Sequence, residues 1–405
     1  MQGKSFWTHP WTLVVAGGLI MGMALGVRHV QGLFLVPVTM HHGWSRETFA
    51  FAIAVQNLAW GVAQPFTGMV ADRYGSMKVI AAGVLVYAVG LVLMAQSQTP
   101  LQFTLSGGLC IGVALSGTSF GAIYGALSRI VAPERRSWAL AAAGAIGGFG
   151  QFAMVPATQE LLDAMGWVAA LMAMALVIAL LLPLALPLKE PRSASAGAAP
   201  AMPLSTALRQ AFGHGGFWLL NFGFLACGFQ LAFIASHMPA YLLDHGLTPQ
   251  DGVVALALIA LTNVLGTYAC GPLGAAYRRK RLLALIYLLR TAAIAAFVML
   301  PLSTTTLYAF SIAMGLLWLG TAPLTNGLVS QIFGVRYVST LFGFVFLSHQ
   351  VGSFLGVWLG GHVFEVTRSY DAVWFGAMGL GLLAAALHWG IDDRELVSPR
   401  MPVPA

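Results

Sequence analysis

Twelve stretches of mostly apolar residues follow one another along this chain of 405 residues. A helix needs about 20 such residues to cross a bilayer, and these stretches lack the alternation of membrane-spanning strands. We therefore predict an all-α membrane protein with twelve transmembrane helices in two pseudo-symmetric bundles of six. The predicted spans are 11–36, 47–71, 78–97, 101–128, 138–162, 166–188, 215–243, 251–275, 282–301, 304–331, 338–363 and 372–390.

The composition agrees with a membrane protein and argues against other classes. Only 8% of the residues are charged, against about 25% in soluble domains. The net charge of +7 does not indicate nucleic-acid binding, because the basic residues lie in short loops between the spans. The three cysteines, Cys110, Cys227 and Cys270, lie inside spans without metal-ligand spacing. We expect no metal, no cofactor and no enzymatic activity.

The basic residues also predict the orientation. With the N-terminus inside, 16 of the 20 Lys and Arg residues fall in cytoplasmic segments, and only Arg46 and Arg368 fall in outside loops. Arg28 and Arg290 lie within spans. The positive-inside rule therefore places both termini in the cytoplasm and the protein in the cell (inner or plasma) membrane, with several passes.

The two halves of the chain resemble each other at an offset of 202 residues. Gly125–Ser128 matches Gly327–Ser330, and Ser137 matches Ser339. Two parallel repeats of six spans are the architecture of a transporter that rocks around a site near the midplane. The predicted parts are an N-terminal six-helix bundle (1–190), a cytoplasmic linker (191–214) and a C-terminal six-helix bundle (215–405).

The loop between the second and third spans carries a motif. Gly68, Asp72, Arg73, Gly75 and Lys78 keep the spacing Gly-x-x-x-Asp-Arg-x-Gly followed by a basic residue. Here the chain resembles the major facilitator superfamily. Asp72 is expected to lie against a neighbouring helix N-terminus, where a negative charge is favoured, and to latch the cytoplasmic side closed. The alternative is a tight turn with orientation charges.

A narrower resemblance covers most of the chain. Arg28–Phe34, Gly43–Arg46, Ala132–Arg136, Gly144–Gly150 and His349–Gly352 are similar to bacterial relatives of the monocarboxylate transporters, near the oxalate–formate exchanger branch. The resemblance implies a small monocarboxylate as substrate, a basic residue in span one that serves substrate and proton, with His29 or Arg28 as the nearest match, and a basic residue in span eleven.

Two segments depart from that family pattern. Thr8–Trp11 stands where the family has an acidic, glycine-rich entry to span one. Thr267 and Gly271 stand roughly where the family has an Asp and an Arg in span eight.

The charges within the spans are cationic only. All 13 acidic residues fall in loops or near span ends. An Arg at mid-span costs roughly 2.5–3.5 kcal/mol on insertion scales, so it is usually paired or functional. An anionic substrate would supply the missing charge for Arg28, whose guanidinium suits a carboxylate. The alternatives for Arg28 are capping of backbone carbonyls or a bond between the halves. For Arg290, in a peripheral span, interhelix bonding or snorkelling is favoured over substrate contact.

Five further residues are substrate-site candidates. His29 and His349 are also candidates for proton coupling, because histidine titrates near neutral pH. Tyr124 and Asn326 occupy equivalent positions in spans four and ten, and Gln230 is the repeat mate of Arg28. For each of the five, the alternative is a packing role.

The leading hypothesis is a proton-coupled symporter or exchanger that moves a small organic anion by alternating access. Its expected partners are the anion, the proton and the lipid bilayer, without nucleic acid, and it is expected to act as a monomer. One alternative is an efflux carrier for amphipathic drug-like compounds. Another is a membrane sensor or receptor built on a transporter fold, although the longest loop is too short for a signalling domain.

Overall fold

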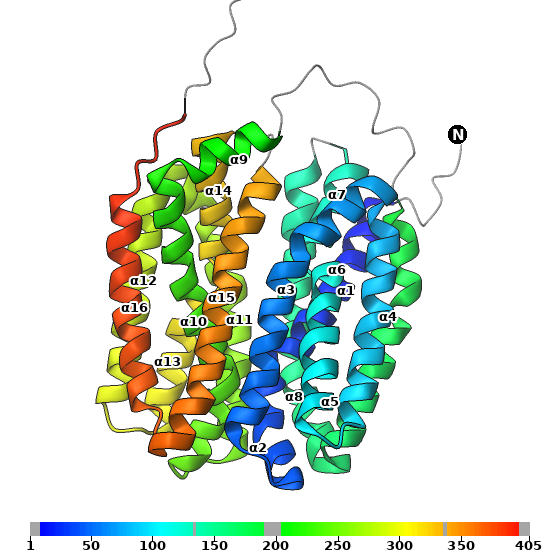
Figure 1. Cartoon of the computed structure of the whole chain (residues 1–405), viewed down its shortest axis with the longest axis vertical. Coiled ribbons are helices and arrows are strands. Elements are labelled where there is room, and N and C mark those ends of the chain that lie inside the picture. The colour runs from blue at the N-terminus through cyan, green and yellow to red at the C-terminus, as the bar shows by residue number, and fades with distance from the viewer. Residues whose placement is uncertain (1–8, 133–134, 190–203, 335–337, 397–405) are drawn as a thin grey trace, which may run out of the picture.

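The computed structural model describes residues 9–132, 135–189, 204–334 and 338–396. Long helices run side by side along the molecule, and those of the first and second halves of the sequence form two groups (Figure 1). The predicted all-α architecture is confirmed, and no strand occurs within the described ranges.

The first group contains the helices up to residue 188. They are α1 (Pro10–His29), α2 (Gln31–His42), α3 (Arg46–Tyr74), α4 (Ser76–Ala95), α5 (Pro100–Phe103), the π-helix η2 (Thr104–Cys110), α6 (Ile111–Thr118), α7 (Phe120–Ile130), α8 (Arg136–Leu180) and the 3-10 helix η4 (Leu182–Leu188).

The second group begins after a short helix, α9 (Leu204–Phe212), which lies across the end of the bundle (Figure 1). The linker residues 190–203 lie outside the described residues. The long helices that follow are α10 (Gly215–Asp244), α11 (Pro249–Ala276), α12 (Arg279–Met299), α13 (Thr304–Leu316), α14 (Thr321–Phe333), α15 (Val338–Thr367) and α16 (Asp371–Gly390).

Twelve crossings can be traced through these helices. Ten stretches of the described residues are long and apolar enough to span a membrane. One of them, Trp138–Leu188, makes two crossings, because Gly166 (φ 73°, ψ 173°) turns the chain within α8. The remaining crossing is α3, whose 29 residues suffice in length but whose glutamines and asparagine lower its hydropathy.

The internal repeat is visible in where the helices begin. The starts of α3 and α11, of α4 and α12, of α7 and α14, and of α8 and α15 lie 203, 203, 201 and 202 residues apart. Equivalent helices therefore begin at equivalent points of the two halves.

Glycine allows the closest helix contacts. A Cβ on Gly22 of α1 would lie 3.1 Å from the Cα of Gly147 in α8, and one on Gly150 would lie 2.9 Å from the backbone of Gly22. Between the two groups, a Cβ on Gly32 of α2 would lie 2.3 Å from the carbonyl oxygen of Ala235 in α10. Helices that lack side chains at the contact approach closely, which is the usual way that membrane helices associate.

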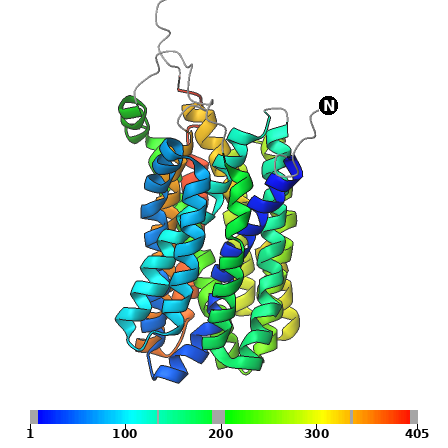
Figure 2. The ribbon, with the colours of Figure 1, turned by 90° about the vertical axis from the view of Figure 1, so that its right-hand side faces the viewer.

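Three of the crossings are interrupted in their middle. Val30 separates α1 from α2, Ser119 separates α7 from α6, and residues 317–320 separate α13 from α14. The first crossing, in dark blue, also runs obliquely through the molecule (Figure 2). Such breaks leave backbone groups without helical partners, so side chains must satisfy them inside a membrane.

Candidate substrate site

Arg28, near the end of α1, faces α3. Its Nη2 donates a hydrogen bond of 2.5 Å to Oδ1 of Asn57, and its guanidinium lies 5.3 Å from the ring centre of Trp60. Asn57 is oriented for this contact, because its own amide donates to the carbonyl of Ile53 one turn earlier. The Nε–H of Arg28 has no partner, and the side chain is only partly buried. This guanidinium therefore keeps unused donor capacity.

Trp60 connects Arg28 to the second half. Its indole N–H donates to Oγ of Ser119, at the α6–α7 break, and to Oε1 of Gln64 (3.1 and 3.0 Å). Its ring meets Phe346 of α15 edge to face, with centroids 5.1 Å apart, and Phe346 stacks on His349 (5.7 Å, 5°). A row of rings thus runs from the guanidinium of Arg28 to His349.

His29 points toward a different part of the second half. Its Nε2 donates to the carbonyl oxygen of Leu256 in α11 (3.2 Å), and its ring meets Trp318 edge to face at 6.5 Å. Successive residues of a helix point about 100° apart, so Arg28 and His29 contact different helices. His29 is buried and joins the two halves.

The remaining candidate residues are more scattered. His349 is 8% exposed, and its Nδ1 lies 3.2 Å from Oε1 of Gln350. Tyr124 is half-buried beside Phe120. Asn326 is exposed on α14.

Gln230 bonds to a helix that Arg28 does not contact. It is fully buried, and its amide donates to the carbonyl of Ala377 in α16 (2.9 Å). The structure therefore links Arg28 to His349 through Trp60 and Phe346, and it places Gln230 against α16.

Asn57, Trp60 and Phe346 were not among the residues singled out from the sequence. A signal for the first two exists: Asn57, Trp60 and Gln64 lie three and four residues apart in an otherwise apolar span, which places them on one face of a helix. Phe346 has no such signal, because one more aromatic residue in an apolar span looks like lipid-facing material.

The loop motif is only partly visible. Gly75 adopts φ 94° between α3 and α4, a conformation that favours glycine. Lys78 is exposed, and a Cβ on Gly68 would meet nothing within 4 Å. The side chains of Asp72 and Arg73 lie outside the described residues, so the latch stays a prediction.

Arg46 joins the two halves at the end of the molecule away from the start of α1 and the end of α16. Its guanidinium makes two hydrogen bonds to the carboxylate of Asp244 on α10 (2.5 and 2.7 Å) and one to the hydroxyl of Tyr370 (3.2 Å). It also lies 4.1 Å from the ring centre of Phe364, and its backbone N–H donates to Glu365. Burial raises the pKa of Tyr370 to about 12, so its hydroxyl stays protonated.

The adjacent Glu47 makes a second tie. Its Oε1 accepts hydrogen bonds from the indole N–H of Trp358 (3.3 Å) and from Nδ1 of His362 (3.0 Å), both on α15. The start of α3 is thereby joined to both α10 and α15. We call Arg46, Glu47, Asp244 and His362 the outer latch, after the orientation that the basic residues predict.

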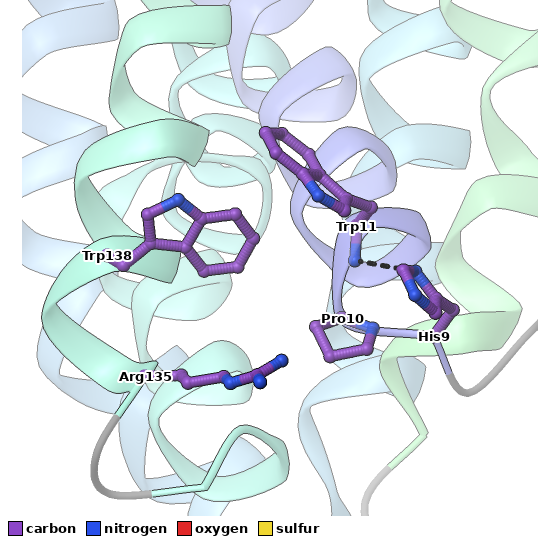
Figure 3. Close-up of a pocket in the computed structure, with 5 residues that line it drawn as sticks. All are labelled: His9, Pro10, Trp11, Arg135 and Trp138. Carbon is purple, nitrogen blue, oxygen red and sulfur yellow. Dashed lines mark hydrogen bonds between the residues drawn. The ribbon is translucent and has the colours of Figure 1, made fainter.

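A pocket of about 230 Å³ opens at the opposite end, between the starts of α1 and α8 (Figure 3). His9, Pro10, Trp11, Arg135 and Trp138 line it, and the indoles of Trp11 and Trp138 meet edge to face at 4.8 Å. Tryptophan beside basic residues is typical of the membrane–water boundary. Trp11 and Arg28 are about 26 Å apart along a helix, so this pocket is separate from the surroundings of Arg28.

Comparisons with known proteins agree with this architecture. The family described as the Major Facilitator Superfamily matches residues 14–357. Monocarboxylate transporter 13 of Rattus norvegicus is 27% identical over 382 residues, which cover 93% of this chain and 87% of the rat protein. An uncharacterized MFS-type transporter of Bacillus subtilis, YcxA, is 23% identical over 356 residues, covering 83% and 84%.

Two solved structures share the fold. The nucleoside transporter NupG matches with a TM-score of 0.73 at 15% identity, covering 94% of this chain and 99% of its own. A bacterial homolog of the human lysosomal transporter Spinster, inward-facing and unoccupied, matches with a TM-score of 0.67 at 14% identity, covering 96% and 95%.

The twelve helices, their repeat and their interrupted crossings thus define an integral membrane protein with a transporter fold. The chain belongs to the Major Facilitator Superfamily, and the resemblance seen in the sequence, to that superfamily and to monocarboxylate transporters, is confirmed.

Proposed function

We propose that this protein is a secondary transporter that moves a small organic anion of the monocarboxylate type, coupled to protons, by alternating access. The observation that carries the proposal is the guanidinium of Arg28. It lies in the middle of the first crossing, with the neutral side chains of Asn57 and Trp60 as its neighbours.

Electrostatics favours an anion as the missing partner. The ion pairs found among the described residues lie at the ends of the helices, and none of them includes Arg28. A charge within the membrane is stabilised by a counter-charge or by a water-filled cavity, and such a cavity concentrates anions. Relatives that are named monocarboxylate transporters support a carboxylate as that anion.

The outer latch supports alternating access. The hydrogen bonds described between the two halves lie in this latch and its neighbours, apart from that of His29 to Leu256. We propose that residues 1–190 and 215–405 move as two bodies joined by the linker 191–214. With both termini in the cytoplasm, the latch lies on the outside of the cell membrane and this conformation is closed to the outside.

For coupling, we propose that His29 and His349 take up the proton. The described carboxylates that form ion pairs lie at the helix ends, whereas both histidines lie at the depth of Arg28 or beside its row of rings. His29 donates through Nε2 and retains Nδ1 as a site for a second proton.

The test measures thermal stabilisation of the purified protein by a panel of small carboxylates and by the matching neutral amides. Removing one partner of a buried charge pair costs about 3–5 kcal/mol, so Arg28→Gln should weaken carboxylate binding by a factor of hundreds or more. Arg28→Lys should give an intermediate loss, because lysine lacks the two-pronged geometry.

The matched control is Arg281→Gln, which removes the same charge from an exposed position next to Trp389. It should bind the carboxylates as the wild type does. Near wild-type affinity in Arg28→Gln, or equal binding of amides and carboxylates by the wild type, would refute the anion proposal.

A further inference from the structure

Arg290 of α12 is a buried cation for which the proposed transport cycle gives no role. Its side chain is 0% exposed. Its Nε and Nη2 donate to the carbonyl oxygen of Leu317 (2.8 and 2.5 Å), and Nη2 also donates to that of Trp318. Its Nη1 lies 3.1 Å from Sγ of Cys227 on α10. Each of the three guanidinium nitrogens therefore has at least one protein partner.

Its two carbonyl partners belong to the break between α13 and α14. Residues 317–320 lie between the two helices, and the backbone N–H of Ala322 donates to the carbonyl oxygen of Leu319. Unsatisfied carbonyls are costly inside a membrane. A guanidinium carries five N–H donors in a fixed fork, so one arginine can satisfy two adjacent carbonyls, whereas the single ammonium of lysine matches them poorly.

The same break is fixed from the other side by α11. The N–H of Leu319 donates to Oδ1 of Asn263 (3.0 Å). A Cβ on Gly266 would lie 1.9 Å from the carbonyl oxygen of Leu316, so the two backbones are in direct contact. The break is consequently held between Arg290 and α11.

The break also carries Trp318, which reaches the other half of the molecule. Trp318 is 5% exposed, and its ring packs edge to face on His29 of α1. His29 in turn bonds to Leu256 of α11. The position of this tryptophan therefore affects a residue of the candidate substrate and proton site.

We propose that Arg290 is a positioning residue for transport: it holds the α13–α14 break open and thereby places Trp318 against His29. The role in transport rests on the proposed function, whereas the role in the break does not. The break in the equivalent crossing of the first half has neutral partners instead, since Trp60 donates to Ser119 there.

The first arm of the test needs no substrate. Hydrogen–deuterium exchange is measured on the full chain in lipid nanodiscs, for wild type and Arg290→Lys. The amides of residues 317–322 should exchange about tenfold faster in the variant, with unchanged exchange in α1 to α8, because only the local opening becomes easier. The matched control is Arg279→Lys, on the same helix, where the side chain bonds to Gln331 instead of the break. Unchanged exchange at 317–322, or faster exchange throughout the chain, would overturn the proposal.

The second arm is a double-mutant cycle on the turnover of carboxylate uptake. Arg290→Lys and Trp318→Phe should each lower the maximal rate by about tenfold with little change in KM, and the double variant should be no worse than either alone. Additive losses would show that Arg290 does not act through Trp318.

Failure of the proposed function and failure of the Arg290 proposal give different results. If no carboxylate is moved by the wild type, the proposed function fails while the exchange arm still decides the role of Arg290. If Arg290→Lys does not reach the membrane, Arg290→Gln, whose uncharged amide has two N–H donors instead of five, replaces it in the exchange measurement with the same expected result and the same refuting one.

Discussion

The outer latch offers a prediction whose size can be worked out from the structure. Asp244→Asn keeps the shape of the side chain but removes the charge that faces Arg46. Because Arg46 lies on α3 and Asp244 on α10, the pair exists only while this end of the molecule is closed. Its loss should therefore shift the equilibrium toward the conformation that is open at this end.

The magnitude follows from burial. The side chains of Arg46 and Asp244 are 17% and 30% exposed, so the burial of this ion pair is intermediate between that of exposed pairs and that of fully buried pairs. Exposed pairs contribute about 0.2–1 kcal/mol, and breaking a buried pair costs about 3–5 kcal/mol. We expect about 1.5–2 kcal/mol, which is a factor of roughly 10–30 in the equilibrium.

The assay uses a cysteine in place of Ser236, a nearly isosteric change at the contact of α2 and α10. Ser236 is 7% exposed and its carbonyl lies against Gly32, so a membrane-impermeant maleimide reaches it only when this end opens. The labelling rate should rise by roughly 10–30-fold in the Asp244→Asn background. Arg368→Gln is the control, because its ion pair with Glu365 stays within one half. An unchanged rate in Asp244→Asn, or an equal rise in Arg368→Gln, would refute the reasoning.

Three further predictions follow from single contacts. Arg278 donates a hydrogen bond to Asp393 and thereby lowers the pKa of this carboxyl group. The stability that the carboxylate contributes is therefore present above its unfolded pKa of about 4 and is lost as the pH falls through its folded pKa. The melting temperatures of wild type and Asp393→Asn should converge in acid. Replacing His29 and His349 together by Gln should flatten the pH dependence of uptake, and a full pH response in that double variant would place the coupled proton elsewhere. Gly266→Ala should lower stability by about 1–3 kcal/mol, measured as a drop in melting temperature, whereas Gly271→Ala on the same helix, which meets nothing within 4 Å, should not.

The sequence was sufficient for the fold because the membrane leaves few solutions. Span length, the absence of strand alternation and the 202-residue offset determine a two-fold bundle of twelve helices. One crossing, α3, is less apolar than the others among the described helices. Its polar side chains lower its hydropathy, and they face other helices instead of lipid: Asn57 meets Arg28, and Gln56 donates to the carbonyl of Gly107.

The site was less predictable because the repeat is not exact at the level of side chains. Gln230 is the sequence mate of Arg28, yet its amide bonds to α16. The helix of Arg28 ends at Val30, whereas α10 continues without a break through the equivalent position. A helix that stops and restarts presents different faces before and after the break, so equivalence along the sequence does not ensure equivalence in space.

Arg28 and Arg290 show what decides between a structural and a functional buried charge. Both are arginines inside apolar spans, and both lack an acidic partner in the part of the chain that the structure describes. Arg290 spends Nε, Nη1 and Nη2 on protein atoms, and its side chain is fully enclosed. Arg28 uses Nη2 for one neutral amide and has no partner for Nε.

Because a guanidinium gains most from charged acceptors, the incompletely satisfied Arg28 has more to gain from a carboxylate than Arg290. The position of Arg290 in a peripheral span already favoured interhelix bonding, but the sequence could not show its partners, because these are carbonyls freed by a break in another crossing.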